Sequence, residues 1–143
     1  MRSLNDSSAV EISSGRAQTV LFAVGDYVAG ALIGAATAAA VRATIYPELD
    51  MVMAMLIGMA VGMVVHLVVG LLLTPVVGAF HVMIPGSLIG MYGGMFFAMR
   101  DTMQQHAGSL AHAVAIGAVF GLVVTAAVQA YDWVLRSGTT LED

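Results

Sequence analysis

Methionine recurs at every fourth position on two apolar stretches of this chain, a spacing that could build a metal site. One stretch carries Met51, Met55, Met59 and Met63, and the other carries Met91, Met95 and Met99. Residues four apart share one face of a helix, so each stretch presents a stripe of thioether sulfur atoms. Thioethers and imidazoles are soft ligands that suit Cu(I). The pattern therefore indicates a site for a soft metal ion between the two stretches.

The two stripes are expected at the same depth in a membrane, because each descends from a charged loop on the same side of it. These loops are residues 42–50 and 100–106, and counting inward from them places a histidine near the level of the methionines. We predict that five side chains line one cavity and bind the metal: Met55, Met59, Met95, Met99 and His112.

Repeated methionine at a spacing of four, with GxxxG motifs elsewhere in the chain, resembles the ligand arrangement of Ctr-type copper uptake proteins. The resemblance is one of motif alone, and the expected number of membrane spans differs. It implies Cu(I) as the bound ion. The alternative interpretation is packing, because methionine is unbranched and polarizable and fills the grooves beside glycine-rich helices.

A second pair of polar residues lies in the opposite half of the expected membrane domain. Asp26 and His66 each fall on the small-residue face of an apolar stretch, at similar depth. A charge near the bilayer centre costs about 2.5–3.5 kcal/mol on insertion scales, so we predict that the two side chains interact. Either they form a proton or ion relay, or they form a structural hydrogen bond between helices. Thr125 and Gln129 reach the same level and would complete a polar cluster.

The composition indicates a protein whose surroundings are mostly lipid. Of its 143 residues 59% are hydrophobic and only 10% are charged, whereas soluble domains carry about 25% charged residues. The absence of cysteine excludes disulfides and thiolate sites. No basic patch indicates nucleic acid as a partner. Motifs of hydrolases, kinases and phosphate loops are missing, and no extended soluble domain could hold an active site, so an enzyme is not expected.

The chain divides into a polar leader at residues 1–16, a membrane domain at 17–136 and a polar tail at 137–143. Within the domain, four apolar stretches reach or exceed the roughly 20 residues that a bilayer requires. They cover about residues 17–41, 51–73, 80–99 and 107–134. Pro75 should end or kink the second, and Pro85 should bend the third. The predicted fold is all-α: an integral membrane bundle of four transmembrane helices with glycine-rich close packing.

Every predicted span carries small residues at a spacing of four, which permits close contact between helices in lipid. The stripes begin at Gly30, Gly58, Gly86 and Ala113. Four helices cannot easily bury four such stripes together with two methionine stripes. We therefore expect the chain to form a homo-oligomer or to join other membrane subunits, with the lipid bilayer around it.

Four spans place both termini on one side of the membrane. Arg2, Arg16 and Arg136 lie on that side, while Arg42 and Arg100 lie on the other, so the positive-inside rule favours cytoplasmic termini in a multi-pass protein. The first functional hypothesis is a small membrane protein that binds or transports a soft metal ion, with Cu(I) as the preferred ion. The alternative is a non-catalytic accessory or assembly subunit of a larger membrane complex. A third hypothesis is a proton- or ion-coupled carrier that uses Asp26 and His66.

Overall fold

The chain forms helices throughout the part that the structure, a computed structural model, describes: residues 2–46, 48–77, 79–104 and 109–139. These ranges contain no strand. The elements in chain order are α1 (Arg2–Thr44), α2 (Met51–Val77), α3 (Ala79–Leu88), η1 (Ile89–Gly93), α4 (Gly94–Met103) and α5 (Leu110–Thr139), where η1 is a π-helical segment. The prediction of an all-helical protein is confirmed.

Three of these helices are long and apolar enough to cross a membrane. They contribute the segments Val20–Thr44, Met51–Pro75 and Leu110–Ser137, which are 25, 25 and 28 residues long. They agree with the predicted first, second and fourth spans to within a few residues. The predicted third span corresponds to three short elements, α3, η1 and α4, which follow one another from Ala79 to Met103 without an intervening loop. Pro85 lies inside α3 and the π-helical turn follows it, so this stretch is not one regular helix.

Two predicted boundaries also differ in detail. The polar residues 2–16 belong to the same helix as the first apolar segment, because α1 begins at Arg2. Pro75 does not end α2, which continues to Val77. The loop before α2 ends in a side-chain cap, in which the Val52 backbone N–H donates a hydrogen bond of 3.1 Å to Asp50 Oδ2.

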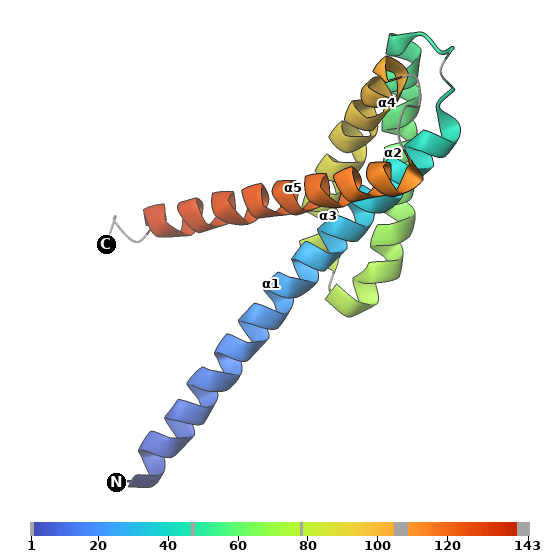
Figure 1. Cartoon of the computed structure of the whole chain (residues 1–143). Coiled ribbons are helices and arrows are strands. Elements are labelled where there is room, and N and C mark those ends of the chain that lie inside the picture. The colour runs from blue at the N-terminus through green and yellow to red at the C-terminus, as the bar shows by residue number, and fades with distance from the viewer. Residues whose placement is uncertain (1, 47, 78, 105–108, 140–143) are drawn as a thin grey trace.

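The helices pack in two antiparallel pairs. α1 packs mainly on α5, and α2 packs mainly on the run of α3, η1 and α4. The two pairs meet because α1 also lies against α2. Figure 1 shows that α1 and α5 cross near the centre of the molecule and then diverge, so that the two termini are far apart.

Glycine permits the close approach in both pairs. Gly30 and Gly34 of α1 face Gly121 and Gly117 of α5. A Cβ atom added to Gly34, Gly117 or Gly121 would collide with backbone of the opposite helix, and one added to Gly30 would collide with the Thr125 hydroxyl. Gly58 and Gly62 of α2 meet Gly94 and Gly90 in the same way. The small-residue stripes therefore lie at helix contacts within one chain, where lipid cannot enter.

A buried ion pair joins the ends of α1 and α4. Arg42 Nη1 lies 3.4 Å from Asp101 Oδ1, and the two side chains are 14% and 5% exposed. Next to this pair lies an apolar cluster of Ala38, Val41, Ile45, Ala54, Phe97 and Ala98. The sequence analysis assigned both charged residues to loops, whereas in the structure they connect two helices.

Candidate functional site

The pairing of α2 with η1 and α4 fixes where the two methionine stripes lie. Ile57 and Val61 pack against the apolar core on one side of the Gly58–Gly62 contact. Successive helix residues turn by about 100°, so Met55 and Met59 lie on the other side of that contact. The methionine stripe of α2 thus faces away from α1.

The stripe on η1 and α4 lies on the same outer side. Phe97 of α4 belongs to the core cluster beside α1, while Met91 and Met95 each follow a contact glycine by one residue and lie on the opposite side of it. Because the two helices run antiparallel, these sides coincide. Met55, Met59, Met91 and Met95 therefore flank one edge of the glycine contact, and we call this edge the methionine groove.

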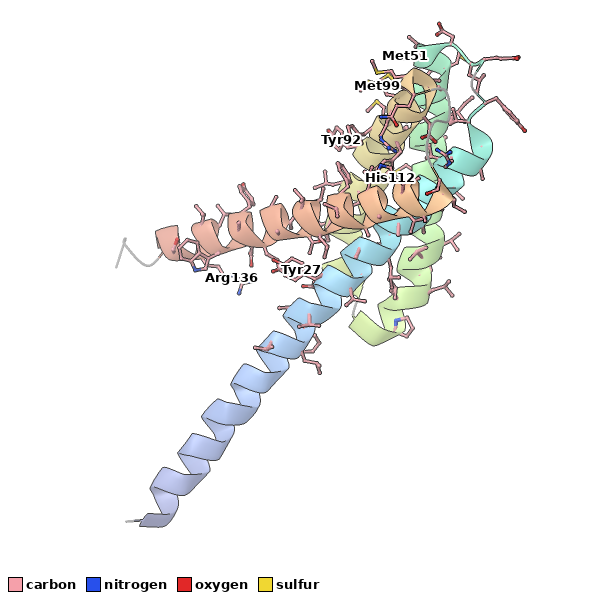
Figure 2. All side chains as sticks on the ribbon, viewed as in Figure 1. Tyr27, Met51, Tyr92, Met99, His112 and Arg136 are labelled. Atoms are coloured by element: carbon pink, nitrogen blue, oxygen red, sulfur yellow. The ribbon has the colours of Figure 1, made fainter. Side chains whose placement is uncertain are left out.

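All four side chains of the methionine groove are half-buried, and so is Met99 one turn beyond Met95. The two ends of the α2 stripe are more open, with Met51 40% exposed and Met63 36% exposed. Figure 2 labels Met51 at the start of α2 and Met99 on α4, and both lie at the same end of the molecule. The groove is thus a partly sheltered row of sulfur atoms.

His112 belongs to a different helix contact. It lies in the first turn of α5, where it is exposed and where Ser109 caps its backbone N–H at 3.2 Å. α5 contacts α4 through Phe120, whose ring lies against Phe97, 5.5 Å between centroids, and Phe96. That contact is on the core side of α4, away from the methionine groove. The structure thus brings the two stripes to one edge. His112 comes from a third helix, α5, and its approach to the methionines remains a prediction.

No three His, Asp or Glu side chains come together as a metal site in the part of the chain that the structure describes. His81 and His106 fall outside the side chains that are described.

The Asp26 carboxylate interacts with α5. Gln129 Nε2 donates a hydrogen bond of 3.4 Å to Asp26 Oδ2. This hydrogen bond confirms the prediction that the Gln129 side chain lies at the same depth as Asp26. Thr125 lies one turn away and is buried against Gly30, with its hydroxyl donating a 2.9 Å hydrogen bond to the Gly121 carbonyl. Asp26, Thr125 and Gln129 form the polar region between α1 and α5.

His66 lies on α2, at its contact with α3. Its ring packs against Gly86, near Ile33, and is 6% exposed. Among the residues that the structure describes, its buried Nδ1 atom has no hydrogen-bond partner, and neither has the buried hydroxyl of Thr37. The hydrogen bond described at Asp26 comes from Gln129. The predicted interaction between Asp26 and His66 is not tested by it and remains a prediction.

A cleft opens where α1 and α5 diverge, with α3 as its third wall. Its volume is about 790 Å³, and its lining includes Phe22, Asp26, Pro85, Gln129, Trp133 and Arg136. Spacing within the sequence indicated the polar residues of this region but not the cleft, because the cleft depends on the angle at which two distant helices cross.

Comparison of the chain with protein families, with curated proteins and with solved structures finds no match.

Proposed function

We propose that this protein binds Cu(I) in the membrane through the methionine groove and transports it or hands it on. The observation that carries the proposal is the register of the α2–α4 contact. Gly58 opposite Gly94 and Gly62 opposite Gly90 place methionines from two helices on one edge.

The ligand chemistry agrees with this proposal. Thioether sulfur is a soft, uncharged ligand that suits Cu(I) over the harder divalent ions. Since thioethers carry no proton to lose, the site can form in an apolar setting without burying anionic ligands. Successive methionines on one helix are about 6 Å apart along its axis, which offers a bound ion neighbouring positions along the groove.

The proposal includes a membrane topology. Residues 79–103 would cross the bilayer beside α2 as one interrupted span, which brings the total to four, because α3, η1 and α4 follow one another and pair with α2 over the contact glycines. Both termini then share one side, and the arginine distribution favours the cytoplasm for it. The methionine groove would lie in the half of the membrane nearer the outside, as uptake requires.

Replacement of two facing methionines tests the metal site. The double variant Met55→Leu, Met95→Leu removes one sulfur from each helix and keeps volume and apolarity. Each substitution should therefore lower the free energy of unfolding by less than about 1.5 kcal/mol. Mutation of residues that hydrogen-bond to metal ligands lowers metal affinity by roughly 10–100-fold. Loss of two ligands should lower the Cu(I) affinity by more than that. The measurement is competition for Cu(I) against a chromogenic chelator with the purified protein under reducing conditions.

The matched control is Met53→Leu, Met103→Leu, because these two methionines are 52% and 66% exposed and lie outside the groove. It should keep the wild-type affinity, and so should His112→Ala if the groove alone supplies the ligands. A wild-type protein without Cu(I) affinity, or a groove variant that retains it, would overturn the proposal and leave the membrane-complex subunit as the better hypothesis.

A further inference from the structure

The cleft between α1, α3 and α5 has the size of a small-molecule site. Its volume of about 790 Å³ falls within the roughly 300–1,000 Å³ that is usual for ligand pockets. In Figure 1, α1 and α5 cross and then separate toward the termini, and their glycine contacts lie at the crossing. Ile84 and Pro85 of α3 contribute its third wall.

The polar groups of the cleft are arranged in two layers. Asp26 and Gln129 lie deeper, joined by the 3.4 Å hydrogen bond, and both are half-buried. Asp132 and Arg136 lie at the exposed rim, where they form an ion pair at 2.7 Å. The lining thus has two carboxylates and one guanidinium, a formal charge of one negative unit, which favours a cation over an anion.

Aromatic side chains from both helices accompany these groups. Phe22 lies one turn before Asp26 on α1, and Tyr131 and Trp133 lie on α5, and all three line the cleft. Aromatic rings attract cationic groups through their electron-rich faces. An ionisable residue that lines a cleft inside a membrane segment marks a functional site by default, and here it lies among apolar and aromatic surfaces.

We propose that this cleft binds an ammonium group that is attached to an apolar body. The cationic nitrogen lies at the Asp26 carboxylate beside Gln129, and the apolar part lies along Phe22, Ile84 and Pro85. Two sources offer this chemistry: the amine of a phosphatidylethanolamine headgroup, and a free amphipathic amine that partitions into the bilayer. This binding is separate from the methionine groove, because none of the groove methionines lines the cleft.

Trp133 provides a direct measurement, because it is the single tryptophan of the chain and lines the cleft. The full chain in nanodiscs of a neutral galactolipid, which carries no ammonium group, is titrated with benzyldimethyldodecylammonium while Trp133 fluorescence is recorded. We expect a saturable change for wild-type protein. Asp26→Asn should weaken binding by at least about tenfold, since it removes the charge and keeps the shape.

Two controls make the result specific. Asp50→Asn removes a carboxylate at the start of α2, far from the cleft lining, and retains helix capping, so its affinity should equal that of wild type. An uncharged alcohol with the same twelve-carbon tail should not saturate. Equal affinity of wild type and Asp26→Asn, with unchanged elution volume and helix content, would refute the proposal, as would a saturable response to the alcohol.

The two sources are distinguished by the lipid. If phosphatidylethanolamine occupies the cleft, nanodiscs containing that lipid should shift the titration of wild-type protein to higher amine concentration, and Asp26→Asn should abolish the shift. If the ligand is a free amine, the wild-type titration should be the same in both lipids. Absence of any saturable response in either lipid would refute an ammonium site altogether.

Discussion

At the scale of single residues, Asp26 shows what burial inside a membrane helix demands. Its carboxylate lies within the apolar segment Val20–Thr44 and is reached by the side chain of Gln129, which is 103 positions away in sequence. The sequence could predict that Asp26 needs polar contacts, because a charged group in lipid is costly. It could not establish that Gln129 donates to Asp26, since that contact depends on how α1 is rotated against its neighbours.

A double-mutant cycle measures the interaction. Asp26→Ala and Gln129→Ala should be non-additive in the free energy of unfolding, with a coupling of about 0.6 kcal/mol, the average for polar contacts between membrane helices, and at most about 1.7 kcal/mol. The measurement is denaturation in mixed micelles of wild type, both single variants and the double variant.

The same cycle with Asp26→Ala and His66→Ala serves as the comparison. His66 packs against Gly86 between α2 and α3, so additivity within about 0.5 kcal/mol is expected for this pair. Strong coupling of Asp26 to His66, with none to Gln129, would instead support the relay that the sequence suggested.

At the scale of elements, glycine contacts hold the two helix pairs together. Replacing Gly117 by leucine should push α5 from α1, because even a Cβ atom at this position would lie 2.6 Å from Ala38 Cβ and 2.9 Å from the Gly34 carbonyl carbon. We expect a loss of about 1–3 kcal/mol in unfolding free energy, typical of overpacking. Thermal unfolding in detergent measures it.

Ala126→Leu is the matched control for this prediction. Ala126 is exposed on the same helix, so the added leucine should leave the unfolding temperature nearly unchanged. If Gly117→Leu were as stable as Ala126→Leu, the α1–α5 contact would not contribute to the fold.

The small-residue stripes illustrate how far element-scale prediction reaches. A spacing of four predicts which face of each helix packs closely, and Gly34 and Gly62 do lie at contacts. The spacing does not say which stripe meets which, because all four are chemically alike. Nor could it reveal the π-helical turn of η1, which follows from backbone geometry around Pro85 and adjacent glycines and not from a periodic pattern.

At the scale of the whole molecule, the arrangement predicts a topology. The Arg42–Asp101 pair brings the end of α1 beside the end of α4, so the loops that follow these helices should share one side of the membrane. Cysteines introduced at Glu48 and Gln104 should react with an impermeant reagent from the same side, and one at Ser137 from the other. The chain has no native cysteine to interfere.

Labelling of Glu48→Cys and Gln104→Cys from opposite sides would mean that residues 79–103 do not cross the bilayer. The sequence analysis expected four spans from hydropathy, and the structure gives three candidates by length and composition. Hydropathy measures how apolar a stretch is, but it does not reveal whether a proline and a π-helical turn interrupt the helix. The cysteine labelling is therefore aimed at the stretch of residues 79–103.

The contact between α1 and α5 joins the first helix to the last, and this has a consequence for biosynthesis. Gly34 leaves the ribosome long before Gly117, with which it packs; at about 5–20 residues per second the delay is on the order of ten seconds. The nascent α1 therefore remains without its α5 contact during this interval. α2 and α4 can pack together once Met103 has left the ribosome. The methionine groove is complete at that stage, whereas the cleft at Asp26 exists only once the final helix has been inserted.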